Sequence, residues 1–476
     1  MGVKKNIGWN MLLTLSAYVF PLLTFPYVTR VLGPAGFGMA NFALSVVDYA
    51  VLLSTLGMTL VGIRSIAQCP PSREERSKVF SHLISVHLLF SFAALIIYFI
   101  VVWFTPSLSS NKELYFIGSA KILFNVFLVE WLYQGLQDFR YVTLRTLFVR
   151  TVYVVAIFLF VRHKEDYDIF FYITIAQVVL NAIINWRYSR KYVSFTFYWH
   201  GNKEYLSPVA SMGVNSVLLS FYTTFNVLFL GFCCGDEPVG YYSAAVRLYG
   251  LILSVISAYN GVFVPYMNTL YANGEIDKFR EVVSKSISLV CMVSLPIIIG
   301  GTILAPQIIR LVAGAGFERA VLPFRIILIQ VLLVGIAQIL ECQILLAYKK
   351  YREILICTAL TALLSTLIII IFVPLYAENA AAIAVALPHL IELILLYIYV
   401  RKIIEIPQSY TEWRAYLCSC IPVAIICYFI YVIGLPYYWK VIIAIPVCII
   451  LYYVLLRYVF NNSIITEITH KTLNKE

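Results

Sequence analysis

Residues 7–30 have the sequence IGWNMLLTLSAYVFPLLTFPYVTR, and residues 38–63 have the sequence GMANFALSVVDYAVLLSTLGMTLVGI. Each stretch exceeds the roughly 20 apolar residues that an α-helix needs to cross the hydrocarbon core of a bilayer. The first carries one charged residue at its end, and the second carries only Asp48. Lys4 and Lys5 precede an uncharged run that is too long for the core of a cleavable signal peptide. We therefore expect a retained first membrane span.

The same pattern continues through the whole chain of 476 residues, of which 61% are hydrophobic and 12% charged. That charged fraction is about half the value typical of soluble domains, so a soluble multidomain enzyme is excluded. The composition predicts an all-α polytopic membrane protein of about 14 transmembrane helices. The apolar stretches lie at residues 7–30, 38–63, 79–105, 114–137, 144–161, 169–187, 206–232, 239–270, 286–310, 323–347, 354–376, 379–400, 415–434 and 440–460.

The net charge of +11 is concentrated in alternate connections between these stretches. Short cytoplasmic loops carry an excess of Lys and Arg, so this bias predicts that both termini are cytoplasmic. With a mean hydropathy of +0.87, the chain has no solvated basic face for nucleic acid, which we exclude as a partner. No connection is long enough to hold a folded domain, so the function is expected within the membrane or at its surface.

The sequence carries no sign of catalysis or of a cofactor. Ten cysteines are scattered without the ligand spacing of a metal site, and small apolar packing explains them. No phosphate-binding glycine loop, nucleophile elbow or paired catalytic carboxylates are present. We therefore expect no enzyme activity, no catalytic residues, no metal and no ATP use.

An internal repeat is indicated when the sequence is shifted by 202 residues, because Gly33 then aligns with Gly235 and Gly38 with Gly240. Six spans separate the paired elements, which predicts two parallel halves, as in many transporters. Polar residues form a stripe along each of the two equivalent helices. The stripes are Asn41, Ser45, Asp48, Thr55 and Thr59 in the first half and Ser243, Arg247, Gly250, Ser254 and Ser257 in the second. They indicate a hydrophilic cleft between the halves, although helix packing alone also explains the serines and threonines.

Ionisable residues inside membrane spans are functional candidates because an exposed charge is costly in lipid. His389 and Glu392 share one helix face, a spacing that suits a proton-binding pair or a structural hydrogen bond. Lys121 and Glu130 are nine residues apart and lie on opposite faces of one helix, so they cannot pair with each other. The ion-coupling candidates are His389, Glu392, Glu341, Lys121 and Glu130.

Several segments resemble the polysaccharide-export branch of the MATE-like flippases, the Wzx-type translocases of O-antigen and capsule repeats. The likeness lies in TFPYVTRVLGPAGFGMANFALSVVDYAVLLSTLG and VGIRSIAQ, in EWLYQGLQDFRYVTLRTLFVR and in VGYYSAAVRL, and more loosely in ILLAYKKYREILI and AAAIAVALP. The resemblance implies two six-helix lobes that open alternately to each side. We expect an N-lobe at 1–205, a C-lobe at 206–405, and an extra helix pair with a cytoplasmic tail at 406–476.

The resemblance also implies a substrate, undecaprenyl pyrophosphate bearing a short oligosaccharide, moved from the cytoplasmic to the outer leaflet of the bacterial inner membrane. A polysaccharide polymerase and a chain-length regulator are the implied partners besides membrane lipid. Arginine forks suit a diphosphate, so Arg247, Arg30 and Arg64 are the expected diphosphate contacts. Asp48, Asn41 and Ser243 are expected to hydrogen-bond sugar, and Tyr241, Tyr242 and Tyr249 to stack on it or bind it through their hydroxyls.

Three alternatives stay open at this point. A cation-coupled multidrug exporter of the wider MATE group would favour carboxylates over the arginines found in these spans. A membrane glycosyltransferase or polymerase would normally need a large outer loop with catalytic side chains. A scaffold for the assembly machinery would leave the matched polar stripes unexplained. The coupling ion, whether proton, sodium or none, is also open.

Overall fold

A computed structural model describes residues 3–109, 111–198, 203–407, 410–462 and 465–466. These residues form helices and no strand. The chain divides into two compact units, unit 1 at Met1–Gly240 and unit 2 at Tyr241–Glu476. The boundaries that we predict for the two lobes and the extra helix pair remain predictions.

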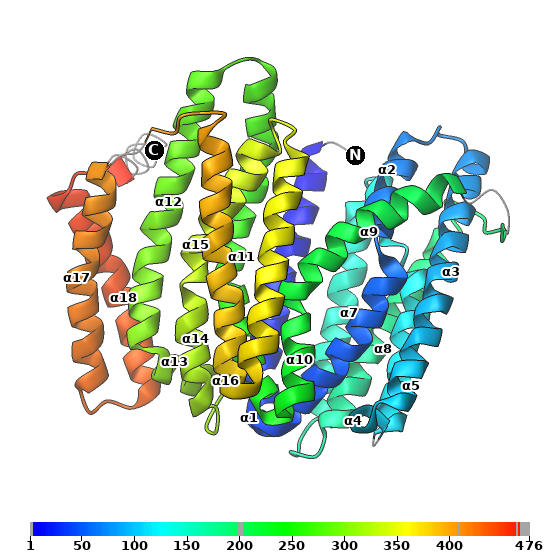
Figure 1. Cartoon of the computed structure of the whole chain (residues 1–476), viewed down its shortest axis with the longest axis horizontal. Coiled ribbons are helices and arrows are strands. Elements are labelled where there is room, and N and C mark those ends of the chain that lie inside the picture. The colour runs from blue at the N-terminus through cyan, green and yellow to red at the C-terminus, as the bar shows by residue number, and fades with distance from the viewer. Residues whose placement is uncertain (1–2, 110, 199–202, 408–409, 463–464, 467–476) are drawn as a thin grey trace. The chain divides into compact units, whose positions relative to one another are not determined.

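Unit 1 contains ten helices in the described part of the chain and the start of an eleventh. They are α1 (Val3–Thr55), α2 (Met58–Gln68), α3 (Arg73–Phe104), α4 (Pro106–Ser109), α5 (Lys112–Asn125), α6 (Glu130–Gly135), α7 (Phe139–Phe160), α8 (Tyr167–Ser189), α9 (Lys203–Thr223), α10 (Phe225–Cys234) and the start of α11 (Asp236–Ala272). A 3₁₀ turn at Val126–Leu128 joins α5 to α6. Figure 1 shows α9 running obliquely to its neighbours, and α9 and α10 meet at a bend of 47°.

Unit 2 continues with the rest of α11 and seven further helices among its described residues. They are α12 (Ile276–Ile303), α13 (Ala305–Val312), α14 (Val321–Leu328), α15 (Gln330–Gln338), α16 (Tyr351–Arg401), α17 (Tyr410–Val432) and α18 (Tyr437–Val454). A 3₁₀ turn at Glu318–Ala320 precedes α14, and π-helical turns follow α15 at Ile339–Leu345 and α18 at Leu455–Val459. Helix α17 packs along α12.

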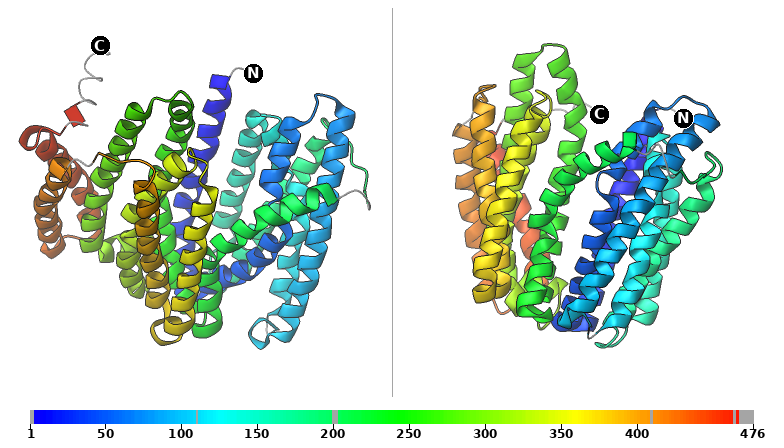
Figure 2. Two further views of the ribbon diagram at one scale, coloured as in Figure 1. Left: turned by 45° about the horizontal axis from the view of Figure 1, so that its top comes forward. Right: turned by 45° about the vertical axis from the view of Figure 1, so that its right-hand side comes forward.

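The helix α1 doubles back on itself at Gly33, whose backbone (φ 68°, ψ 179°) is a conformation that essentially only glycine adopts. The rings of Phe25 and Phe37 lie 5.7 Å apart across this reversal. A straight helix would separate them by about 18 Å. Both arms can be followed in Figures 1 and 2. The sequence therefore places this turn correctly, between the first two apolar stretches.

A second reversal divides α16 at Ala377, which has a φ of 44°. The Ser365 hydroxyl donates to the Ala384 carbonyl oxygen at 2.7 Å, so the two arms lie side by side. This turn also falls between two predicted spans, the eleventh and the twelfth. The positive φ is unfavourable for an alanine, and packing of the arms holds it in place.

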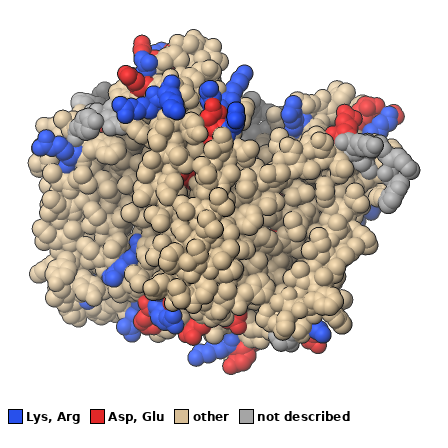
Figure 3. All heavy atoms as spheres, viewed as in Figure 1, with Lys and Arg blue, Asp and Glu red and all other residues tan. Residues whose placement is uncertain are grey.

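The described residues contain eleven helices long and apolar enough to cross a membrane, or twelve if α9 and α10 form one bent span. The chain is thus a multi-pass membrane protein, although the count of fourteen crossings remains a prediction. Figure 3 shows most charged side chains near the helix ends, with a largely uncharged surface between them on the face in view. This distribution is the one that a bilayer requires.

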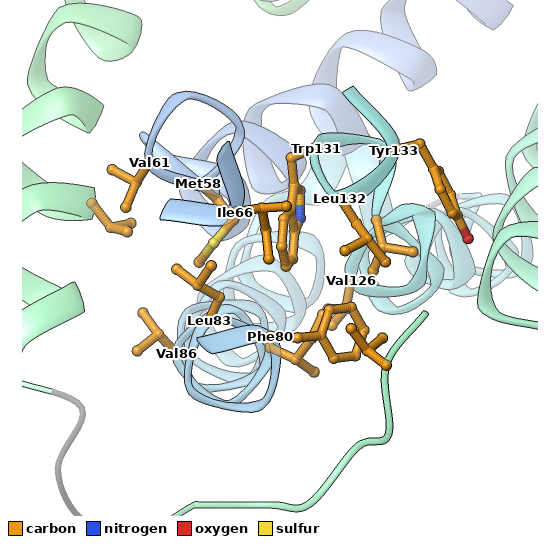
Figure 4. Packing of buried hydrophobic residues seen from close by; sticks show 14 of the residues in the cluster. Met58, Val61, Ile66, Phe80, Leu83, Val86, Val126, Trp131, Leu132 and Tyr133 are labelled. Carbon is orange, nitrogen blue, oxygen red and sulfur yellow. The ribbon is translucent and has the colours of Figure 1, made fainter. Parts of the chain in front are cut away.

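The core of unit 1 is built where α2, α3 and α6 meet (Figure 4). The Trp131 indole packs against α2 at Gly62, where an added Cβ would lie 2.6 Å from the ring. Phe80 contributes a ring 5.6 Å from that of Trp131. This contact fixes α6 directly after the 3₁₀ turn, and so it fixes the position of Glu130 at the start of α6.

The glycines that indicate the repeat lie at a close crossing of two chain segments. A Cβ on Gly38 would lie 1.8 Å from the carbonyl oxygen of Asp236, and a Cβ on Gly240 would lie 2.1 Å from that of Pro34. Under the 202-residue shift, Pro34 corresponds to Asp236 and Gly38 to Gly240, so the two contacts are equivalent. Gly235 also has the Gly33 conformation, with φ 85° and ψ −171°.

Candidate functional site

The clearest polar contact inside unit 1 joins Asp48 on the second arm of α1 to Lys121 on α5. The Lys121 ammonium nitrogen lies 2.5 Å from one Asp48 carboxylate oxygen. The Asp48 side chain is 44% exposed, whereas that of Lys121 is 16% exposed. Lys121 is nine residues from the start of α5, about 14 Å along the helix. An ionised carboxylate this far inside a span costs about 2.5–3.5 kcal/mol in lipid, which favours a hydrated surface for Asp48.

The next turn of the same two helices carries a second polar contact. The Asn125 amide donates to the Thr55 hydroxyl oxygen at 2.6 Å. Thr55 follows Asp48 by two helical turns and Asn125 follows Lys121 by one, so both contacts lie along one seam between α1 and α5. The polar stripe that we predicted for the second span thus includes two residues that contact α5 of the same unit.

A third contact follows the 3₁₀ turn, where Glu130 binds Arg145 of α7. The Arg145 guanidinium donates to a Glu130 carboxylate oxygen and to the Asn181 amide oxygen, both at 2.7 Å. Glu130 is 41% exposed and Arg145 only 3%. Sequence reasoning missed Arg145 because it lies at a predicted span end, where cations are common. Lys121 and Glu130 have separate partners, as their spacing requires.

Unit 2 contains an equivalent hydroxyl and amide contact. Ser257 of α11 corresponds to Thr55 under the 202-residue shift, and its hydroxyl lies 3.2 Å from the Gln338 amide oxygen. Gln338 ends α15 directly before a π-helical turn, just as Asn125 ends α5 directly before a 3₁₀ turn. Asn260 donates to Gln338 and accepts from Gln343 in the π-helical turn. These amides were not predicted, although their place near a matched stripe was a usable signal.

The ion-coupling candidates of unit 2 fall on two neighbouring elements. His389 and Glu392 lie on the second arm of α16, with 3.9 Å between an imidazole nitrogen and a carboxylate oxygen. The other His389 ring nitrogen lies 2.7 Å from the Val385 carbonyl oxygen. Glu341 lies in the π-helical turn, which contacts α16. The structure therefore brings His389, Glu392 and Glu341 into one region of unit 2.

The tyrosines that we expected to contact sugar are largely covered. Tyr241 and Tyr242 at the start of the unit 2 part of α11 are 4% and 2% exposed, whereas Tyr249 is partly buried. The Tyr241 ring packs against Phe317 and beneath the Arg319 guanidinium, 5.2 Å from the ring centre. Arg319 also donates to the buried carboxylate of Glu378 at 3.0 Å, so a polar cluster forms around Tyr241.

The remaining predicted residues lie apart from these contacts. Asn41 donates to the Phe37 carbonyl oxygen of its own helix, and Ser243 is buried on α11. Arg247 is partly buried on the same helix. Arg30 is exposed just before the Gly33 reversal, and Arg64 is exposed on α2, beyond the far end of the second arm of α1. That arm is about 33 Å long, so one diphosphate cannot contact both arginines at once.

Comparison with known proteins assigns a family. The family model described as polysaccharide biosynthesis protein matches residues 3–271, more than half of the chain. The chain belongs to this polysaccharide biosynthesis family. A relative named putative O-antigen transporter from Escherichia coli K12 is 24% identical over 419 residues, covering 84% of this chain and 97% of the relative. A protein with the same name from Shigella dysenteriae is 26% identical over 253 residues, covering 52% of this chain and 62% of the relative.

Solved structures give the fold of this family member. A lipid II flippase, MurJ, in an inward closed conformation matches with a TM-score of 0.80 at 14% identity, covering 96% of this chain and 100% of that one. An inward-facing multidrug resistance MATE transporter of the MOP superfamily matches with a TM-score of 0.61 at 14% identity, covering 80% and 94%. The predicted all-α, MATE-like fold is thus confirmed.

Proposed function

We propose that the protein is a flippase for undecaprenyl-pyrophosphate-linked oligosaccharide repeat units of O-antigen, capsule or exopolysaccharide. It moves them from the cytoplasmic to the outer leaflet of a bacterial inner membrane. The observation that carries this proposal is the half-exposed Asp48 carboxylate, held by Lys121 deep inside a span. Family membership and relatives named as O-antigen transporters support the same substrate class.

The physical need for such a protein lies in the headgroup. Burying a hydroxyl without a hydrogen bond costs roughly 2–7 kcal/mol, so an oligosaccharide cannot cross lipid without a polar path. Hydrated ion pairs within a span provide such a path. The isoprenoid tail can stay in the bilayer throughout, so only the headgroup needs the protein. Alternating access to the two sides then moves the headgroup without enzyme chemistry or ATP.

We assign the diphosphate to arginines and the sugars to the other polar residues. Arg247 is the main diphosphate contact, and Arg30 and Arg64 act at different stages because they lie at opposite ends of an arm. Asp48, Asn41 and Ser243 bind sugar hydroxyls. Tyr241, Tyr242 and Tyr249 take part only when their present packing opens, since Tyr241 and Tyr242 are covered.

Coupling to an ion gradient is assigned to unit 2. His389, Glu392 and Glu341 combine an imidazole and two carboxyl groups on two elements of the unit that contact each other. Lys121 and Glu130 are less suited to this role because each is engaged in an ion pair. The Lys and Arg bias of the connections supports cytoplasmic termini and fourteen crossings. A polysaccharide polymerase and a chain-length regulator are the partners that a released repeat unit requires.

The test in cells uses a strain that lacks the chromosomal gene and depends on the introduced protein for surface polysaccharide. Arg247→Ala should abolish surface polysaccharide while the protein level in the membrane stays normal, and Arg247→Lys should retain part of it. Normal surface polysaccharide with Arg247→Ala would contradict the assignment of Arg247. Surface polysaccharide that does not depend on the protein at all would contradict the proposed function.

A further inference from the structure

The two ion pairs of unit 1 share a feature that concerns the chemistry of the headgroup. In both, the carboxylate is the exposed partner and the cation is the covered one. Asp48 is more exposed than Lys121, and Glu130 is more exposed than Arg145. Within the described residues, one carboxylate oxygen of each pair binds the cation and the other oxygen has no partner.

Asp48 lies in a row of polar contacts along the seam between α1 and α5. The row consists of Asp48, Thr55, Lys121 and Asn125, and together with the Glu130–Arg145 pair that follows the 3₁₀ turn we call it the polar face of unit 1. Asp48 and Thr55 are seven residues apart, about 10 Å along the helix, so the row is long enough for more than one contact with a headgroup. Glu130 follows after the 3₁₀ turn, at the start of α6.

The charges of this polar face leave no cation available to an acidic sugar. Lys121 is opposed by Asp48, and Arg145 behind the face is opposed by Glu130, so the two pairs together are neutral. The Arg145 guanidinium also donates to Asn181, which keeps it directed into the unit. The more exposed partner of each pair is a carboxylate, which accepts hydrogen bonds and repels anions.

We propose that the polar face of unit 1 selects oligosaccharides rich in hydrogen-bond donors, neutral hexoses and N-acetylhexosamines, over those carrying uronic acids. This inference rests on the proposed function and specifies its substrate class. Hydroxyl and amide N–H groups of a neutral sugar donate to the open oxygens of Asp48 and Glu130. A sugar carboxylate in the same place faces a carboxylate across a poorly screened surface.

The test uses the full-length protein in lipid nanodiscs and two matched probes. Both are undecaprenyl pyrophosphate carrying an N-acetylglucosaminyl disaccharide; the second sugar is galactose in one and galacturonic acid in the other. The two differ only by a hydroxymethyl group against a carboxylate. We expect the galactose probe to bind about tenfold more tightly, the effect of one unfavourable like-charge contact.

Two variants assign the preference to the polar face. Asp48→Asn and, separately, Glu130→Gln should bring the ratio of the two affinities closer to one, because each removes one of the repelling charges. Asp277→Asn is the matched control: its carboxylate forms an exposed ion pair with Arg280 at the start of α12, and the ratio should stay at the wild-type value. Gel filtration of each variant establishes that it is folded. If one of the two variants does not fold, the other still tests the preference.

The outcomes separate the two proposals. Equal or tighter binding of the galacturonic acid probe to the wild-type protein would overturn the preference while leaving the flippase function intact. If the affinity ratio is unchanged in both folded variants, the preference does not arise from the polar face. Binding of neither probe would contradict the proposed function, and the preference with it.

Discussion

The Lys121 ammonium group of α5 lies 2.5 Å from the Asp48 carboxylate of α1, and the carboxylate is the more exposed of the two. The pair joins two helices inside the membrane and presents an acceptor oxygen on its open side. We expect Asp48→Lys or Lys121→Asp alone to destabilise the protein by about 1–3 kcal/mol, between the values for exposed and buried pairs. The double exchange should recover part of this loss in thermal unfolding of the detergent-solubilised protein. A double variant no more stable than the worse single variant would contradict the pairing.

Arg145 should be among the most sensitive positions of unit 1. Arg145→Ala leaves the Glu130 carboxylate and the Asn181 amide without their shared donor; because Glu130 is 41% exposed, we expect a loss of about 1–3 kcal/mol, between the values for exposed and buried pairs. Arg145→Lys should recover only part of this, because one ammonium replaces a guanidinium that reaches both groups. Arg140→Ala, at an exposed position on the same helix, is the control and should change the melting temperature little. Equal effects at both positions would exclude a special role for Arg145.

The crossing of Gly38 and Gly240 allows no side chain. Gly38→Ala or Gly240→Ala would place a Cβ about 2 Å from a backbone carbonyl oxygen, so the backbone must move, at a cost of about 1–3 kcal/mol. Gly250→Ala in α11 is the matched control, because a Cβ there meets nothing within 4 Å. It should be neutral or stabilising by roughly 0.5–1 kcal/mol. Normal stability and transport in Gly38→Ala would show that the crossing is looser than described.

The role of His389 can be separated into structure and proton binding. If the His389, Glu392 and Glu341 region couples transport to protons, His389→Ala should remove the pH dependence of transport between about pH 5 and 8, the range in which histidine usually titrates. His389→Gln should keep a hydrogen bond to the Val385 carbonyl oxygen and preserve folding. Transport measured across this pH range in vesicles decides the matter. A pH profile that is the same in both variants and in the wild type would favour a purely structural role.

The helix pair α17 and α18 can be tested by its cysteines. The sulfur atoms of Cys427 and Cys448 lie 3.4 Å apart, so a small movement brings them to the disulfide distance of about 2.05 Å. Oxidation with copper-phenanthroline should join these two residues within one chain, as peptide mass spectrometry would detect. Cys448→Ala should abolish the product, and Cys418→Ala, at an exposed position on α17, should not. Cross-linking of Cys427 to another cysteine would contradict the packing of the pair.

The long-range order of the fold could be predicted because bilayer thickness fixes the length of each apolar stretch. The reversals at Gly33 and Ala377 fall between predicted spans, and the family resemblance is confirmed. The interruption of the fourth span at Val126–Leu128 could not be predicted, since no proline or glycine marks it. Val129 has a φ of 38°, unfavourable for a β-branched residue, and the packing of Trp131 against Gly62 holds the chain there.

The candidate site could be predicted only in part, because the sequence reveals single charges but not their partners. Asp48, Lys121 and Glu130 are recognisable in sequence as charges within apolar stretches, and the structure describes a partner for each. Their partners are not recognisable in this way, because Arg145 is close to a span end and resembles a loop cation. Gln338 and Asn260 are uncharged and do not interrupt an apolar pattern strongly. Pairing across helices depends on tertiary contacts that a single sequence does not contain.

Translocation itself is measured most directly in vesicles that contain only the purified protein. Undecaprenyl pyrophosphate bearing a fluorescent neutral oligosaccharide is placed in one leaflet, and a membrane-impermeant quencher reports the leaflet in which the sugar lies. We expect the label to cross in vesicles with the wild-type protein, and to stay in place in empty vesicles and with folded Arg247→Ala. The same slow crossing in all three would contradict the flippase function.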